Sequence, residues 1–440
     1  MYFSFLYLIL KFILKNFIPF LVFVGVFLGT GIAYNDFYAF PSPIAAVIGI
    51  ISAYLILPGS VKTKTNNFIK GCGDKNIITM CIIYLLAGGF ATISKEIGSV
   101  DAVVNLGMYF LEPSYYAAGV FVIASFLSLA SGTSVGTIVA LGPIVMGLAN
   151  ASHGNVNILA AALLCGAMFG DNLSIISDTT IAATQILGCS MKDKFRVNIY
   201  FALPAAVITF ILFLIFGTTS NVSNAVAVSF SFQNIVLILP YLVVLLLAFL
   251  GVDVFIVLIT GILLCAVFGY SLVDLNFLDI GKYIYQGFTS MNEIFVLSLL
   301  TGGLAYMVQQ TGVLTTIITT ITKHIKKQRS ALLGIGSLVS IVDAAVANNT
   351  IAIVLTGNVA KEIAIKHKIK AKSTASILDT FSCIIQGIIP YGAQILILIG
   401  FSNSTINYFE LMRYSFYLYI LLIAVLLYIS FGNIKEKSTV

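Results

Sequence analysis

The residues best suited to chemistry lie in a single stretch of the chain. It reads Gly170-Asp171-Asn172-Leu173-Ser174-Ile175-Ile176-Ser177-Asp178-Thr179-Thr180 and lies between the apolar segments AALLCGAMF and IAATQIL. Two carboxylates within an apolar segment are costly to bury unless they have partners or water. If the helix unwinds here, these carboxylates, the hydroxyls and freed backbone carbonyls converge, and hard cations such as Na⁺ prefer such oxygen ligands.

This stretch therefore indicates an ion or proton site. A purely structural role, in which the carboxylates cap helix ends or pair with a lysine, remains the alternative. Asp171 and Asp178 are the expected ligands of a transported Na⁺. The other candidate ligands in the stretch are Asn172, Ser174, Ser177 and Thr179.

A second stretch, late in the chain, predicts a broken helix. It reads Gln386-Gly387-Ile388-Ile389-Pro390-Tyr391-Gly392-Ala393-Gln394. Pro390 removes a backbone donor and clashes with the preceding turn, and the glycines let the helix open at little cost. A proline kink alone does not explain two glutamines within an apolar segment, so Gln386, Tyr391 and Gln394 are candidate ligands. Asp379, upstream, is interpreted as a carboxylate near a helix start.

Two short polar segments interrupt other apolar stretches, near residues 114–150 and 331–360. They read Ser-Gly-Thr-Ser (131–134) and Ala-Asn-Asn-Thr (347–350). Polar tips at membrane depth are tolerated only where they are buried in protein or line water. Each interrupted stretch is either a re-entrant hairpin or a pair of full spans. The candidate ligands here are Thr133, Ser134, Asp343, Asn348, Asn349 and Thr350.

Composition requires a lipid environment for these elements. Of 440 residues, 59% are hydrophobic and 9% are charged, and the mean hydropathy is +1.05. A soluble domain needs roughly a quarter of its residues charged. We therefore expect one integral membrane unit, an all-α, polytopic bundle of transmembrane helices. The net charge of +6 fits cytoplasmic Lys and Arg rather than nucleic-acid binding. The six cysteines form no CxxC pair, which favours packing over a metal or redox site.

Apolar runs of about 20 residues predict the spans. The first 17 residues predict an interfacial helix that leads into the first span. Full spans are expected near 18–34, 41–58, 76–94, 157–190, 197–217, 233–249, 254–270, 291–310, 373–400 and 413–431.

Basic residues predict which loops face the cytoplasm. They cluster at 62–75, 192–196, 323–329 and 361–372, and the second cluster consists of Lys192, Lys194 and Arg196. Alternating these loops across the spans places both termini on the cytoplasmic side of the cell membrane.

The two halves of the chain share an order of features. LLAGGFATISKEIG (85–98) resembles LLTGGLAYMVQQTG (299–312). Each is followed by one of the short polar segments (131–134 or 347–350) and then by a long apolar segment with polar residues in it (170–180 or 386–394). The loop charges start the first half inside and the second half outside. This predicts two inverted repeats, 1–220 and 221–440, with broken helices and re-entrant hairpins.

Four motifs resemble the NhaC-type sodium/proton antiporter family, within the wider ion-transporter superfamily. They are FGDNLSIISDTT (169–180), SGTSVGT (131–137), DAAVANNTIAIVLTG (343–357) and ILDTFSCIIQGIIPYGAQ (377–394). The resemblance covers nearly the whole chain. It implies two hairpin tips and two broken helices around a substrate site. The first-half site would consist of Asp171, Ser177, Asp178 and Thr179, and the supporting ligands would be Thr133, Ser134, Asn348, Asn349 and Gln394. Where the family typically has Lys and Pro, this chain has Asn172 and Ile175.

The predicted function is secondary transport, not catalysis, with Na⁺ leaving in exchange for H⁺ at the carboxylates and no cofactor. The alternative is Na⁺- or H⁺-coupled transport of a small carboxylate or amino acid. An intramembrane aspartyl protease needs Gly-x-Gly-Asp, but Met168 occupies the first glycine position. A passive channel does not explain carboxylates in broken helices, and no Walker A motif supports ATP-driven transport. Stoichiometry and a homodimer stay open.

Overall fold

The computed structural model is built of helices. It describes residues 2–34, 40–110, 112–175, 177–217, 236–313, 315–316, 320, 327–402 and 405–432, and no β-strand occurs among them. Within these ranges, eight helices are long and apolar enough to cross a membrane, or up to ten if each bent pair counts as one span. The predicted class, an all-α polytopic membrane protein, is confirmed.

Each predicted span corresponds to a helix or a helix pair. The unbroken ones are α1 (Tyr2–Tyr34), α2 (Ser42–Ile56), α4 (Lys75–Glu96), α10 (Met191–Phe216), α12 (Leu239–Phe249) and α13 (Val254–Leu272). The others are α15 (Asn292–Gln309) and the pairs α8 (Val156–Leu173) with α9 (Asp178–Leu187), α19 (Ala371–Ile388) with α20 (Ala393–Phe401), and α21 (Tyr408–Tyr414) with α22 (Phe416–Phe431).

Three segments outside the predicted spans are helical. α3 (Val61–Cys72) replaces most of the predicted loop at 62–75, and α5 (Ser99–Phe110) lies between the predicted span at 76–94 and the interrupted stretch at 114–150. α14 (Phe277–Ser290) lies between the predicted spans at 254–270 and 291–310. The Ser60 hydroxyl accepts the Thr63 amide at the start of α3 and so caps its first turn. The end of α3 packs closely on α15. Gly71 permits this approach, since the Cβ of any larger residue there would overlap the Gly302 carbonyl. Tertiary packing thus stabilises α3 as a helix, although its sequence is too polar to predict a membrane span.

Both interrupted stretches are helical hairpins. The first consists of α6 (Tyr116–Ser131) and α7 (Ser134–Ala151), and the second of α17 (Gln328–Val346) and α18 (Asn349–Lys366). The two arms of each hairpin pack on one another and on the nearby broken helix. The part of the chain ahead of the first hairpin adds a short 3₁₀ turn, η1 (Pro113–Tyr115).

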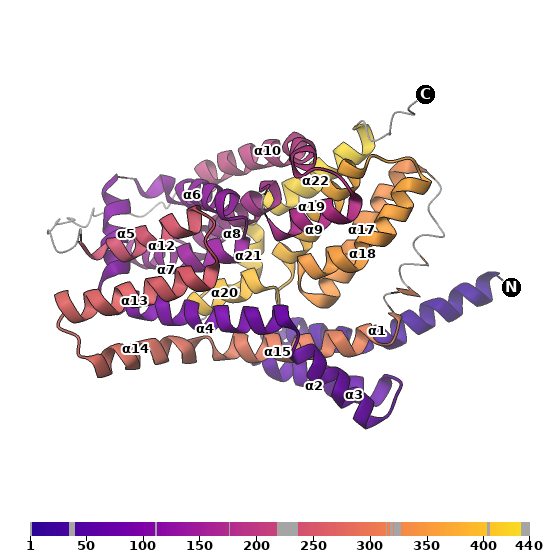
Figure 1. Cartoon of the computed structure of the whole chain (residues 1–440), viewed down its shortest axis with the longest axis horizontal. Coiled ribbons are helices and arrows are strands. Elements are labelled where there is room, and N and C mark those ends of the chain that lie inside the picture. The colour runs from indigo at the N-terminus through magenta and orange to yellow at the C-terminus, as the bar shows by residue number, and fades with distance from the viewer. Residues whose placement is uncertain are drawn as a thin grey trace.

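The helices form two groups, which Figure 1 shows along opposite long sides of the molecule. α4, α14 and α15 run along one side with α1–α3, and α10, α19 and α22 run along the other. The hairpins and broken helices belong to the second group. α4 reaches across to α7 and α20, so the two groups meet where the tips and breaks lie.

Helix pairings between the two halves recur with the roles of the halves exchanged. α3 packs on α15 as α14 packs on α4, and α2 packs on α15 as α13 packs on α4. In the other group, α9 packs on α18 as α20 packs on α7. Both Gly-Gly pairs, 88–89 and 302–303, lie at these close contacts. The correspondence supports a repeat, whereas the inverted orientation of the halves stays a prediction.

We expect the α4–α14 contact to be intolerant of a single methyl group. A Cβ at Gly287 would overlap the Gly88 carbonyl oxygen, whereas a Cβ at Gly281, on the same helix, meets no atom within 4 Å. Overpacking of this kind costs about 1–3 kcal/mol. Gly287→Ala should therefore lower the unfolding midpoint in detergent, while Gly281→Ala should leave it unchanged or raise it, since Ala favours helix by up to about 1 kcal/mol. Equal midpoints for the two variants would contradict this packing.

Candidate functional site

The two hairpin tips are built in the same way. Each has one residue in the left-handed backbone region, which ends the first arm, followed by one residue that caps the second arm. Gly132 (φ 71°) and Thr133 form the first tip, and the Thr133 hydroxyl accepts the Gly136 amide. Ala347 (φ 52°) and Asn348 form the second tip. Positive φ costs an alanine conformational energy that glycine avoids, so the second tip is held by its surroundings.

The two broken helices open beside these tips. α8 ends at Leu173, and Ser177 caps α9 by accepting the Thr180 amide at 3.4 Å. α19 ends at Ile388, and the chain turns through Pro390 and Gly392 before α20 starts. Both breaks thus lie where the polar run and the proline predict them.

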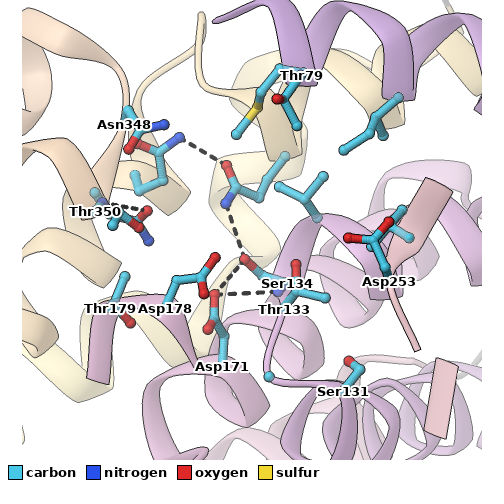
Figure 2. Close-up of a pocket in the computed structure, with 18 of the residues that line it drawn as sticks. Thr79, Ser131, Thr133, Ser134, Asp171, Asp178, Thr179, Asp253, Asn348 and Thr350 are labelled. Carbon is cyan, nitrogen blue, oxygen red and sulfur yellow. Dashed lines mark hydrogen bonds between the residues drawn. The ribbon is translucent and has the colours of Figure 1, made fainter. Parts of the chain in front are cut away.

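Tips and breaks together line one pocket of about 510 Å³, shown in Figure 2. Its wall is completed by α4 and by the segment before α13. The lining residues singled out by the sequence are Thr133, Ser134, Asp171, Asp178, Thr179, Asn348, Asn349, Thr350, Gln386 and Gln394. Thus ten candidate ligands from four separate segments meet at one place.

A chain of hydrogen bonds joins the two halves along this pocket. The Ser134 amide and hydroxyl donate to Asp171 Oδ2 at 3.2 and 2.7 Å, and Gln394 Nε2 donates to the Ser134 hydroxyl at 3.1 Å. Gln386 Nε2 donates to Gln394 Oε1 at 3.0 Å and to the Ala347 carbonyl at 3.3 Å. The first broken helix is thereby connected to the second hairpin tip.

The pocket is acidic. Its described lining includes the carboxylates of Asp171, Asp178 and Asp253 and no Lys, Arg or His. Asp171 is 7% exposed, whereas Asp178, at the start of α9, is exposed within the pocket. The Ser131 hydroxyl and Gln386 Oε1 also line it and are buried without a hydrogen-bond partner. Carboxylate and neutral oxygens of this kind are suited to a cation.

A buried ion pair lies behind this pocket. Lys194 Nζ, on α10, is 2.5 Å from Asp379 Oδ2, on α19, and the two side chains are 0% and 1% exposed. The ammonium also donates to the Asn172 carbonyl at 2.8 Å and to the Thr180 hydroxyl at 2.7 Å. All three of its donors are therefore used. The three bonds connect the end of α8, the start of α9 and the second half.

Amide side chains complete the polar cluster around this pair. Asn172 Nδ2 donates to Asp379 Oδ2 at 3.2 Å, and Asn198 Nδ2 donates to the Asn172 carbonyl at 2.8 Å. The Ser376 hydroxyl donates to Asn198 Oδ1. Asn172 thus faces this cluster and not the pocket.

Four further residues predicted as ligands lie outside the pocket lining. The Ser174 hydroxyl donates to the Leu129 carbonyl, and Ser177 caps α9. The Tyr391 hydroxyl donates to the Ala344 carbonyl at 2.7 Å, with its ring against Phe20 and Phe23 of α1. Asp343 is buried on α17.

The interpretation of Lys194 as a cytoplasmic loop residue is wrong, because it is buried in the second turn of α10. Its position could have been found from helical spacing. Lys194, Val197, Asn198 and Phe201 recur at three- and four-residue intervals and are all buried, whereas Lys192 is exposed. Sequence reasoning also missed Asp253, an isolated acid between two apolar runs that reaches the pocket.

Comparisons with known proteins find a matching family and several relatives. The profile of the Na⁺/H⁺ antiporter family matches residues 4–218 and 219–433. The chain is 26% identical to the Na⁺/H⁺ antiporter NhaC of Alkalihalophilus pseudofirmus, covering 83% of this chain and 85% of that relative. It is 26% identical to a malate-2H⁺/Na⁺-lactate antiporter of Bacillus subtilis, covering 69% and 71%. The crystal structure of the Alcanivorax borkumensis YdaH transporter matches 84% of this chain and 88% of that one, at 13% identity and a TM-score of 0.42.

We expect the Lys194–Asp379 pair to be essential for stability. Removing one partner of a buried ion pair leaves an uncompensated charge and costs about 3–5 kcal/mol. Lys194→Met should therefore lower the melting temperature of the purified protein strongly, and Lys194→Met/Asp379→Asn should recover part of the loss. Lys192→Met, on the exposed face of the same helix, is the matched control. If the Lys194 and Lys192 variants melt alike, the pair does not hold this region together.

Proposed function

The chain belongs to the Na⁺/H⁺ antiporter family, so it is a transporter and not an enzyme, and from this premise we propose that it exchanges Na⁺ for H⁺ at Asp171 and Asp178. The observation that carries the proposal is the acidic pocket between the hairpin tips and the broken helices. Its described lining contains carboxylates and neutral oxygens without a basic residue. Such a pocket is matched to a small cation.

Competition for the carboxylates gives the coupling. A carboxylate that holds a proton has lost the charge that binds Na⁺, so proton and Na⁺ binding oppose one another. Asp178 is exposed within the pocket and can exchange either ion with water. Asp171 is held by two hydrogen bonds from Ser134, both to the oxygen Oδ2. The pocket residues supply neutral oxygens in place of water around the ion.

The proposal includes an arrangement in the membrane. The halves 1–220 and 221–440 are inverted repeats, with both termini in the cytoplasm and the protein in the cell membrane. The corresponding helix pairings support this repeat. The group containing α6–α10 and α17–α22 carries the pocket residues except those on α4 and at 251–255. Movement of this group against the other would expose the pocket to one side and then to the other.

A second candidate function is the coupled transport of a small amino acid or carboxylate. It is favoured by the size of the pocket, since about 510 Å³ falls within the range of small-molecule sites and far exceeds the volume of one Na⁺ ion. The start of α18 lies at this pocket, and a helix N-terminus attracts a carboxylate. The absence of basic residues from the described lining disfavours a dianion relative to a zwitterion.

We expect Asp178→Asn to abolish Na⁺-dependent proton movement in everted vesicles, measured with a pH-sensitive dye. The substitution keeps the volume of the side chain and removes its titratable charge. Asp171→Asn should have the same effect, and Asp178→Glu should retain part of the activity with a shifted pH dependence. Asp279→Asn, on α14 and away from the pocket, should behave like the unmodified protein. Normal transport by Asp178→Asn, with unchanged pH dependence, would show that the site is assigned to the wrong residue.

The same vesicles separate the two candidate functions. For Na⁺/H⁺ exchange, Na⁺ alone should collapse an imposed pH gradient, and adding amino acids or monocarboxylates should leave the rate within about twofold. If an organic solute is the substrate, the pH gradient should instead collapse only when that solute is present. Uptake of labelled solute that requires Na⁺ and is lost in Asp171→Asn would establish the second candidate.

A further inference from the structure

Four aspartates of the broken helices and hairpins have four different environments. Asp178 is exposed in the pocket, Asp171 is hydrogen-bonded to Ser134, and Asp379 is paired with Lys194. Asp343, on the first arm of the second hairpin, is 0% exposed, and neither of its carboxyl oxygens has a hydrogen-bond partner. Of these four acids, it is therefore the one whose burial is not compensated by any described hydrogen bond or ion pair.

This environment favours the neutral form of Asp343. An ionised carboxylate in the protein interior without a partner is strongly disfavoured by the loss of hydration. The titratable groups that interact electrostatically with it are Cys383 on α19 and Tyr391 in the break after it. The described parts of α15, α18 and α22, which also pack on α17, present no hydrogen bond or ion pair to it. Lys194, the buried cation of this region, has all three donors engaged elsewhere.

Asp343 is linked to the cation pocket through the backbone of the second tip. The carbonyl of Ala344, the next residue, accepts the Tyr391 hydroxyl. The carbonyl of Ala347 accepts Gln386 Nε2 and so joins the hydrogen-bond chain that ends at Asp171. Movement of this tip would therefore change both the pocket and the surroundings of Asp343.

We propose that Asp343 is a second proton-binding site, separate from the cation site, that carries one proton in each transport cycle. The proposal rests on the proposed exchange of Na⁺ for H⁺. While the carboxyl of Asp343 is buried, as in this structure, the proton is held there in an O–H bond. When the second hairpin moves and lets water reach the carboxyl, that bond breaks and the proton passes to water on that side. A proton from the opposite side restores the acid later in the cycle.

Asp343→Asn tests this role directly, since it replaces a neutral acid with a neutral amide of the same size. In proteoliposomes, the H⁺:Na⁺ ratio is obtained from the Na⁺ gradient that balances an imposed pH gradient. We expect the ratio of the variant to be lower by one proton per Na⁺ than that of the unmodified protein. Exchange of labelled Na⁺ for Na⁺, which requires no net proton movement, should stay within about twofold. Asp279→Asn is the control for both measurements.

The possible outcomes separate this proposal from the proposed function. An unchanged H⁺:Na⁺ ratio in Asp343→Asn overturns the second proton site. Loss of Na⁺/Na⁺ exchange in a correctly folded variant also overturns it, because Asp343 would then belong to the cation site. Absence of any Na⁺-dependent flux in the unmodified protein instead refutes the proposed function. If Asp343→Asn does not fold, Asp343→Leu, which removes the last polar atoms from the buried position, carries the same comparison.

Discussion

The buried ion pair between Lys194 and Asp379 is the interaction on which the rest of the site depends. A break in α8 frees backbone groups at membrane depth, where no water satisfies them. Lys194 meets this requirement, because its ammonium binds the Asn172 carbonyl on one side of the break and the Thr180 hydroxyl on the other. Asp379 neutralises that ammonium from the second half of the chain. The break is therefore stabilised by a contact between halves and not by its own sequence alone.

A stable break permits the geometry of the pocket. Both tips and both broken helices end their first helix and begin a second one at the same place, so the starts of α7, α9, α18 and α20 lie around one space. Helix starts carry partial positive charge. Asp178 lies in the first turn of α9, and Asp171 accepts the amide of Ser134 at the start of α7. These two carboxylates offset the helix charges and still leave the pocket acidic.

The features that local chemistry determines could be predicted from the sequence. Pro390, with glycines close on both sides, favours the opening of a helix, and a run such as Asp171–Thr180 does not fit an apolar helix, so both breaks could be predicted. The partner of Lys194 was not, because Asp379 is distant in sequence and no local pattern joins the two. Lys192, Asp193, Lys194 and Arg196 read as a charged loop until α10 is known to begin at Met191. The α3 helix was missed for a similar reason, since its position depends on Gly71 packing against α15.

The same physical rule assigns different tasks to acids of one chemical type. A carboxylate at membrane depth needs water, a hydrogen bond, a cation or a proton, and each of the four aspartates has a different one of these. Of these four, Asp178 and Asp171 line the pocket, so these two can exchange a cation directly with it. Asp379 is paired with Lys194, and this pair fixes α10 to α19. An acid without water, donor or cation, as at Asp343, can ionise only if the protein around it rearranges, and this requirement ties its proton to a conformational change.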